Sequence, residues 1–311
     1  MAGFSVSFIW FEGEIEELWL APATTPAFSR GSVLSHEPLD PVQLQQSGEV
    51  KIPEATEESK AAAASTMVIL NALETLLTEK CEELGHIDAI AGDGDHGIGM
   101  LRGVVAACKA ANQALNKGAG VGFLLQTAAD AWSDDAGGTS GAIWGVILNT
   151  LGTTLGNSEK PTVESVTKGV VQANHGVMHF GKAKPGDKTL VDVLMPFSEA
   201  LDSAAAEGLS LAEAWHKAAQ VAEKSAAATA GLGLKIGRAR PLAERRVGTQ
   251  DAGAVSVALM IATVDEQLRN KNEKGRQGGQ VGKQIWRRAQ AIKPIWVTRK
   301  KDSGEDRRQK L

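Results

Sequence analysis

Apolar residues recur every three or four positions through most of the chain. The clearest stripe starts at Val68 and continues through Leu70, Leu73, Leu76, Leu77 and Leu84. This spacing puts the apolar side chains on one face of a helix. The pattern predicts eight helices, at residues 59–84, 97–115, 119–133, 139–155, 162–178, 189–206, 210–228 and 251–268. Short connections containing glycine, proline or aspartate separate most of them, so we predict an all-α antiparallel bundle.

The pattern changes outside this region. Residues 1–31 contain a strand-like apolar run at residues 4–11 followed by an acidic turn, and are too few to fold alone. Residues 32–58 combine prolines with polar residues, which is typical of a linker. Residues 270–311 mix Gly, Gln, Lys and Arg without periodicity and are predicted to be disordered. The folded domain is therefore expected at residues 59–269.

Composition agrees with a globular helical protein. Hydrophobic residues make up 43% of the chain, and there is no tyrosine. Cys81 and Cys108 lie in apolar segments without CxxC spacing, which predicts buried free thiols. The apolar start lacks a basic region, and no apolar run reaches about 18 residues. We expect a cytoplasmic protein with no membrane span.

Charge is unevenly distributed. The net charge is −4, but residues 270–311 hold 13 Lys and Arg against 4 Asp and Glu. This split indicates an acidic body with a basic extension. Trp286 and Trp296 lie among these basic residues, as in some nucleic-acid-binding segments, yet a solvated extension is the simpler interpretation. Nucleic acid is not expected as a partner.

The segment Asp88–Gly97 is the richest in candidate chemistry. Asp88, Asp93 and Asp95 repel one another unless a cation or solvent compensates their charge, and glycines at 92, 94 and 97 allow the backbone to turn. Carboxylate oxygens suit Mg²⁺, which completes its coordination with water and phosphates. A calcium EF-hand loop is excluded because Gly97 stands where that loop needs Asp or Asn. An acidic surface turn remains the alternative, and His96 is either a nucleotide contact or an ordinary histidine.

Two glycine-containing segments suit phosphate. The sequence Gly-Gly-Thr-Ser-Gly at 137–141 opens a predicted helix, where backbone N–H groups and the helix dipole favour an anion. Simple N-capping by Thr139 or Ser140 is the alternative. Ala142 rules out a nucleophile elbow. The lysines of residues 182–189 precede another predicted helix. They could approach a phosphate there, and the alternative is that they are simply solvated.

A long connection at residues 232–250 is rich in arginine. Arg238 could bind phosphate through two hydrogen bonds, or the whole loop could simply be exposed. Asp251 to Gly253 then opens the last predicted helix. Neither a Walker A sequence nor a G-x-G-x-x-G motif after a strand is present. A nucleotide would therefore be bound without either standard phosphate loop.

Taken in order, these motifs resemble the nucleotide-binding L-type (DhaL) domain of dihydroxyacetone kinases, over residues 60–268. The matching pieces are D-x4-D-x-D-H-G at 88–97, G-G-T-S-G at 137–141, G-K-A-x-P-G-D-K-T at 181–189, G-R-A at 237–239 and D-x-G-A at 251–254. The family pattern differs at residues 240–245 and 249–253, which flank the nucleotide pocket.

The resemblance implies a barrel of eight antiparallel helices with the nucleotide site at one end. It implies that Mg²⁺ is held by Asp88, Asp93 and Asp95, and that Arg238 and Lys188 position phosphate. The implied contacts to ATP or ADP are His96, Gly97, Ile98, Gly99, Thr139, Ser140, Gly181, Leu190, Arg238, Asp251, Ala252 and Gly253.

The implied activity is transfer of the ATP γ-phosphate to dihydroxyacetone or a tetrulose such as erythrulose. Residues 1–31 resemble the end of the K-type substrate domain, which supplies a substrate-binding histidine in this family. His36 lies in the linker and does not qualify, so we expect the chain alone to be a poor kinase. Two alternatives stay open, an ADP-binding subunit of a phosphotransferase-system-linked kinase and an inactive fragment. A homodimer is also left open.

Overall fold

The computed structural model describes residues 10, 12–22, 24, 25, 28, 29, 51–90, 92–233 and 248–291. Within these residues, eight long helices follow one another from residue 57 onward, which confirms the all-α prediction. They are α2 Glu57–Ala89, α3 His96–Asn116, α4 Val121–Ala136, α5 Gly138–Leu155, α6 Val163–Gly181, α7 Val191–Ala206, α8 Leu211–Ala228 and α9 Ala252–Ala291. A short 3-10 helix, η1 (Thr229–Gly231), follows α8.

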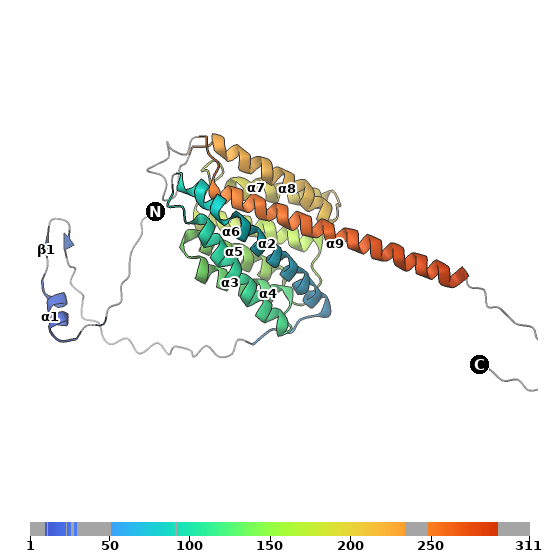
Figure 1. Ribbon diagram of the computed structural model, residues 1–311, viewed down its shortest axis with the longest axis horizontal. Coiled ribbons are helices and arrows are strands. Elements are labelled where there is room, and N and C mark those ends of the chain that lie inside the picture. Colours follow the sequence, from blue (N-terminus) through green and yellow to red (C-terminus); the bar gives the residue numbers. More distant parts are fainter. Residues whose placement is uncertain are drawn as a thin grey trace, which may run out of the picture.

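The eight helices form a closed ring. Each packs against the next helix in the chain, and α9 also packs against α2 (Figure 1). Because successive helices run in opposite directions, the N-termini of α3, α5, α7 and α9 share one end of the barrel with the C-termini of α2, α4, α6 and α8. We call this the site end, and the opposite end the far end.

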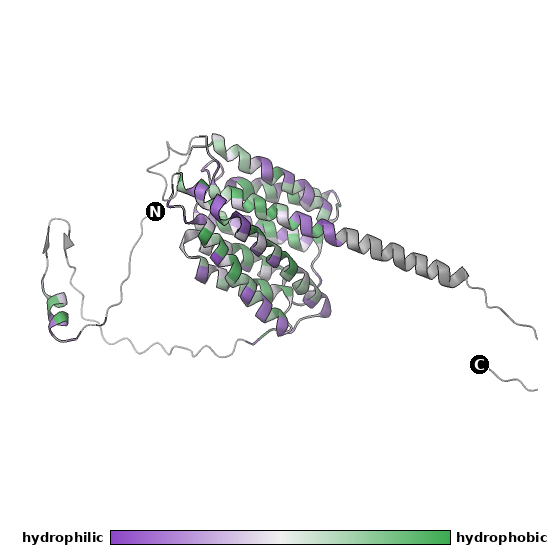
Figure 2. Cartoon of the chain, viewed as in Figure 1, coloured by the Kyte–Doolittle hydropathy of each residue, from purple (hydrophilic) through white to green (hydrophobic). Residues whose placement is uncertain are grey.

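Apolar side chains fill the interior of the barrel, as their helical spacing predicts. Figure 2 shows apolar residues concentrated on the packed faces of the helices and polar residues on the outside. Trp132 is fully buried and stacks on Trp144 with ring centroids 5.2 Å apart. Glycines allow α4 and α5 to approach closely, since a Cβ at Gly122 would lie 2.6 Å from the carbonyl oxygen of Gly156. Side-chain packing therefore supplies most of the stabilisation of these helices.

The two cysteines differ in burial. Both are free thiols, but Cys81 is only half-buried, so the prediction of burial is confirmed for Cys108 alone. Burial, together with a hydrogen bond to Glu74 and its charge, raises the pKa of Cys108 to about 12. The Cys108 thiol therefore stays protonated and unreactive at neutral pH.

Two helices are longer than predicted. α2 continues to Ala89, five residues past the expected end at residue 84, and so carries Asp88 in its last turn. α9 continues to Ala291, so the prediction of disorder is wrong for residues 270–291. This stretch contains many Lys, Arg and Gln, which are good helix formers, and the next proline is Pro294. In Figure 1, α9 projects beyond the other helices.

The N-terminal segment contains a short helix and a small hairpin. Helix α1 spans Glu14–Leu20, and β1 (Thr24–Thr25) pairs antiparallel with β2 (Phe28–Ser29). The predicted acidic turn is thus the first turn of α1, where carboxylates are favoured by the helix dipole. Of the predicted strand-like run at residues 4–11, only Trp10 is among the described residues. Residues 32–50 of the expected linker also lie outside them.

Helix α2 is long and apolar enough to cross a membrane by length and composition. It packs against α3, α4 and α9 within the barrel, and its buried residues include Leu70, Leu77 and Leu84. Length and hydropathy in a single helix of this kind do not identify a membrane span.

Candidate metal and nucleotide site

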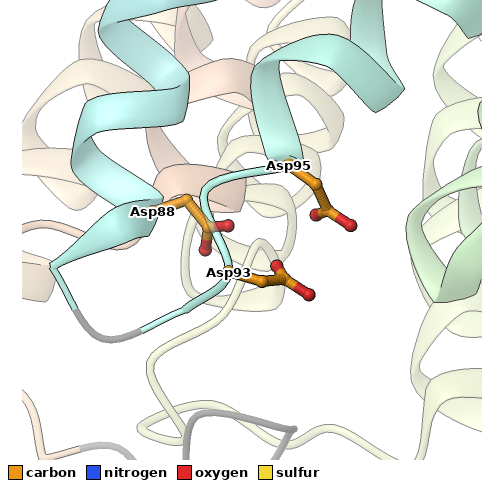
Figure 3. Close-up of side chains that lie close together, drawn as sticks. All are labelled: Asp88, Asp93 and Asp95. Carbon is orange, nitrogen blue, oxygen red and sulfur yellow. The ribbon is translucent and has the colours of Figure 1, made fainter.

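Three carboxylates meet at the site end, where α2 passes into α3. Asp88 lies in the last turn of α2, Asp93 in the connecting loop and Asp95 at the N-cap of α3 (Figure 3). One ligand oxygen from each lies within 4.8 Å of the others. Asp88 is half-buried, and the other two are exposed. The structure thus brings together the three residues predicted as metal ligands.

The backbone explains why these carboxylates converge. Gly94 has φ of +76°, and its N–H donates to Asp88 Oδ2 at 3.0 Å. The Gly92 N–H donates to the Asp88 carbonyl oxygen at 2.6 Å. Both bonds fold the loop back onto the end of α2. Positive φ is easily adopted by glycine, so the sequence at 94 permits this turn.

Gly97 has a different role. A Cβ at this position would lie 1.9 Å from the Cys81 carbonyl oxygen, so only glycine allows α3 to start this close to α2. The Asp95 side chain makes no N-cap hydrogen bond to α3. Its carboxylate is therefore not used to cap the helix and lies with the cluster instead.

This donor set fits a magnesium ion. Mg²⁺ in phosphate-handling sites is usually held by one or two carboxylates together with water and substrate phosphates. Here the exposed Asp93 and Asp95 leave space for such further ligands, and half-buried Asp88 is oriented by the Gly94 N–H. A divalent cation would also relieve the mutual repulsion of the three charges.

His96 links the acidic loop to the start of α9. Its Nε2 lies 3.0 Å from Ser256 Oγ, and this hydroxyl donates to the Gly253 carbonyl oxygen at 2.9 Å. The Nε2–H tautomer of His96 is compatible with both contacts, because its N–H can donate to Ser256 Oγ while the Ser256 hydroxyl donates to Gly253. His96 thus helps to position the first turn of α9. Ser256 was not predicted, because it lies 160 residues from His96 in the sequence.

The start of α5 lies at the same end. Gly137 and Gly138 have φ of +67° and +61°, so the chain turns sharply between α4 and α5. The α5 N-cap, Gly137, provides no side-chain cap. Thr139 is exposed and Ser140 half-buried in the first turn. A Cβ at Gly99 would lie 3.4 Å from the Ala136 carbonyl oxygen, so this corner adjoins the start of α3.

The loop between α6 and α7 is stabilised by Asp192. Its carboxylate accepts hydrogen bonds from the N–H groups of Gly186 at 2.5 Å and Thr189 at 2.8 Å. Asp187 instead accepts from the Lys184 N–H within the same loop at 2.8 Å. This role of Asp192 was not predicted from the sequence. The Thr-x-x-Asp spacing of a capping box at 189–192 was the available signal.

Gly181 and Leu190 lie at the two ends of this loop. A Cβ at Gly181 would lie 3.2 Å from Ile143 Cδ1 in α5. A Cβ at Gly253 would lie 3.6 Å from Leu190 Cβ. Both predicted nucleotide contacts are thus at the site end, and Leu190 adjoins the start of α9.

Lys188 lies within this loop but away from solvent. It is 0% exposed, and its Nζ donates to the Leu232 carbonyl oxygen at 3.1 Å. Lys182 and Lys184 are exposed. Arg238, the other residue predicted to position phosphate, lies outside the described residues, as does the rest of residues 234–247.

Asp251 caps α9. Its Oδ2 accepts from the Ala254 N–H at 2.9 Å, and its own N–H donates to Thr229 Oγ1 at 3.1 Å. Asp251 and Ala252 are buried, with 8% and 2% exposure. These bonds place Asp251–Gly253 at the site end, but they also show that the Asp251 carboxylate is largely engaged by the protein.

The chain matches a known domain family over the barrel. Residues 90–266 match the model of the DAK2 domain. This match covers more than half of the chain. The chain belongs to the DAK2-domain family. Asp93 and Asp95 lie within the matched part of the DAK2 domain, and Asp88 lies two residues before it.

Curated relatives of this DAK2-domain chain are kinases and a kinase subunit. It is 56% identical over 268 residues to an L-erythrulose kinase from Pectobacterium atrosepticum, covering 86% of this chain and 45% of the relative. It is 45% identical over 269 residues to a D-erythrulose kinase from Mycolicibacterium smegmatis, covering 85% and 46%. The chain spans less than half the length of these two relatives.

A shorter relative is matched over most of its length. The Escherichia coli protein named PEP-dependent dihydroxyacetone kinase, ADP-binding subunit DhaL, is 32% identical over 186 residues, which is 60% of this chain and 88% of the subunit. The dihydroxyacetone kinase of C. freundii, solved with AMP-PNP and Mg²⁺, shares the fold with a TM-score of 0.51 and 22% identity. That match covers 83% of this chain and 42% of the solved one. The DAK2-domain barrel predicted from the sequence is thus confirmed.

Proposed function

We propose that this chain provides the nucleotide-binding part of a kinase that transfers the ATP γ-phosphate to a small ketose. The observation that carries the proposal is the cluster of three carboxylates within 4.8 Å at the end of the barrel where four helices begin. Helix N-termini favour phosphate, and clustered carboxylates favour the divalent ion that accompanies it. The similarity to named erythrulose kinases supports this assignment.

Asp88, Asp93 and Asp95 would hold Mg²⁺, which when bound would neutralise charge on the nucleotide phosphates. Thr139 and Ser140 are proposed to position phosphate through the first turn of α5. His96 to Gly99 would lie along the nucleotide, with His96 held by Ser256. Phosphoryl transfer needs mainly positioning and electrostatic stabilisation, which these groups can provide.

The remaining proposed nucleotide contacts come from the resemblance to the family. Gly181, Leu190 and Asp251 to Gly253 would line the pocket, and their positions at the site end are compatible with this role. The buried Asp251 carboxylate caps α9, so its contribution would be to fix the backbone there. Arg238 remains a proposed phosphate contact on the basis of its motif alone.

Erythrulose is the first substrate to test, because three of the curated relatives are named erythrulose kinases. Dihydroxyacetone is the second. The ketose would be bound by a K-type substrate domain, and residues 1–31 are proposed to belong to the end of that domain. A cytoplasmic location, where ATP is available, is part of the proposal.

A coupled assay tests this function. Purified chain, ATP, Mg²⁺ and erythrulose are combined with and without a separately produced K-type substrate domain, and ADP release is measured. We expect turnover only in the complete mixture. Robust turnover by the chain alone would refute the need for a second domain, and no turnover with any ketose in the complete mixture would contradict the kinase assignment.

A second candidate is an ADP-binding subunit of a phosphotransferase-system-linked kinase. It is favoured by the match to 88% of the Escherichia coli subunit. Gel filtration of the purified protein separates the two candidates. ADP that remains bound through the column would support the subunit, whereas ATP that exchanges freely would support the ATP-dependent kinase.

A further inference from the structure

We propose that Lys188 is a positioning residue of the nucleotide site, which joins the loop at residues 182–190 to η1 and so fixes the start of α9. The link to nucleotide binding rests on the proposed function, whereas the link between the segments does not. Lys188 is 0% exposed, although lysine is almost never fully buried without a partner. Its Nζ donates to the Leu232 carbonyl oxygen at 3.1 Å.

The backbone around Lys188 is held in an unusual conformation. Its φ is +62°, in the left-handed region that non-glycine residues adopt when their surroundings enforce it. Asp192 supplies part of this constraint by binding the N–H groups of Gly186 and Thr189, on either side of Lys188. The loop is thus held at both flanks while the lysine side chain extends to Leu232.

Leu232 directly follows η1, which is tied to the start of α9. Thr229 is fully buried, and its Oγ1 accepts from the Asp251 N–H at 3.1 Å. The Ala230 carbonyl oxygen accepts from the Gly248 N–H at 3.1 Å. The Leu232 N–H donates to the Thr229 carbonyl oxygen at 3.1 Å, so a path of hydrogen bonds runs from the Lys188 ammonium through Leu232 and Thr229 to Asp251.

The same two segments also touch directly. Leu190, two residues after Lys188, lies against Gly253, where a Cβ would be 3.6 Å from Leu190 Cβ. Lys188 therefore sets the position of one proposed nucleotide contact, Leu190, relative to another, Asp251–Gly253. Its burial and its bond to Leu232 favour this role over direct contact with a phosphate.

Hydrogen exchange in the absence of nucleotide tests the link itself. Lys188→Met keeps most of the side-chain volume but removes the donor, and Lys184→Met is the matched control at an exposed lysine of the same loop. We expect the Gly248 and Asp251 amides to exchange about tenfold faster in Lys188→Met, with the bundle helices as protected as in the parent. Parent-like exchange at both amides would overturn the proposal. If Lys188→Met does not fold, Lys188→Leu, which also lacks a donor, is measured in the same way with the same expectation and the same overturning result.

Nucleotide titration tests the role in the site. With Mg²⁺ present, Lys188→Met should weaken the binding of ADP and the binding of ATP by the same factor, at least about tenfold. The affinities of Lys184→Met should stay within about twofold of those of the parent. A much larger loss for ATP than for ADP would overturn the positioning role and assign Lys188 to the γ-phosphate. A parent chain that binds neither nucleotide would refute the proposed function, and the exchange experiment would still decide whether Lys188 joins the two segments.

Discussion

The two ends of the barrel differ in how the N-termini of their helices are capped. At the far end, α2, α6 and α8 begin with side-chain caps from Thr56, Thr162 and Ser210, and the last two form capping boxes. The first turn of α4 is capped from elsewhere in the chain, by Ser59 Oγ and Asn157 Oδ1. These bonds satisfy backbone N–H groups that would otherwise need solvent.

At the site end, the N-cap residues of α3 and α5, Asp95 and Gly137, make no side-chain cap hydrogen bond. The other two helix starts are capped. The Val191 N–H of α7 donates to Thr189 Oγ1 at 3.2 Å, and Asp251 caps α9. All four helix starts at the far end are therefore capped by side chains, whereas two N-cap residues at the site end provide no side-chain cap, which is compatible with the proposed phosphate contacts there.

Acidic residues follow the same division. At the far end, Glu164 lies in the first turn of α6, where hydrogen bonds from its own backbone N–H and from Thr162 lower the pKa of its carboxyl. The Glu164 carboxylate therefore stabilises the N-terminus of its own helix. At the site end, Asp88, Asp93 and Asp95 converge on one another instead. The convergence of these three carboxylates is compatible with the proposed cation site.

The largest expected effect comes from removing a carboxylate at the site end. Asp93→Asn should weaken Mg²⁺-dependent ATP binding by at least about 100-fold, because it replaces a proposed carboxylate ligand with a neutral amide. Asp202→Asn, an exposed aspartate near the far end, should leave ATP affinity within about twofold. Equilibrium dialysis with labelled ATP measures both, and circular dichroism checks that helical content is unchanged. Equal ATP affinities in the two variants would contradict a nucleotide site at the site end of the barrel.

The next largest expected effect is on stability and comes from the close backbone contact between α3 and α2. Gly97→Ala should lower the free energy of unfolding by about 3 kcal/mol, since its Cβ would collide with the Cys81 carbonyl oxygen. Gly118→Ala at the far end meets no atom within 4 Å, although its φ is +81°. It should cost only about 1 kcal/mol. Urea denaturation compares the two, and a similar loss in both would show that the close approach of α3 to α2 is easily relaxed.

The two variants with the smallest expected effects separate stability from nucleotide binding. Ser210→Ala removes a far-end capping box and should cost about 1 kcal/mol of stability without changing ATP affinity. Thr139→Ala at the site end should weaken ATP about fivefold and change stability by less than about 0.5 kcal/mol. Thermal unfolding and ATP titration of both variants test this exchange of roles. The reverse pattern would mean that Thr139 is merely a structural residue.

Much of the barrel could be predicted because its helices carry regular apolar stripes. The end of α2 could not, since Gly85 and the polar residues near it look like a helix stop. In the structure Gly85 is a packing residue, with the Gly94 carbonyl oxygen 3.2 Å from where its Cβ would be. Tertiary contacts thus outweigh the local propensity of glycine to end a helix.

The site was predictable where its residues are neighbours in sequence. Asp88, Asp93 and Asp95 share one loop and its edges, so their convergence followed from spacing and glycines. The His96–Ser256 bond and the burial of Lys188 were not predictable, since both depend on segments far apart in the sequence. Lysine is normally exposed, and nothing in the local pattern around residue 188 signals otherwise.

The extension at residues 270–311 shows the limit of composition as a guide. Four glycines between Gly275 and Gly282 interrupt any periodic pattern, and this favoured a prediction of disorder. The helix nevertheless continues from α9 to Ala291. Propagating an existing helix needs no new nucleus, so weak helix formers are accommodated more easily there than at a start.

The most direct test is calorimetric titration of the parent chain with ATP, once with excess Mg²⁺ and once with a chelator. The three clustered aspartates should make binding measurable with Mg²⁺ and at least about tenfold weaker without it. Equal affinity in both conditions, or no heat of binding in either, would contradict a metal–nucleotide site at Asp88, Asp93 and Asp95.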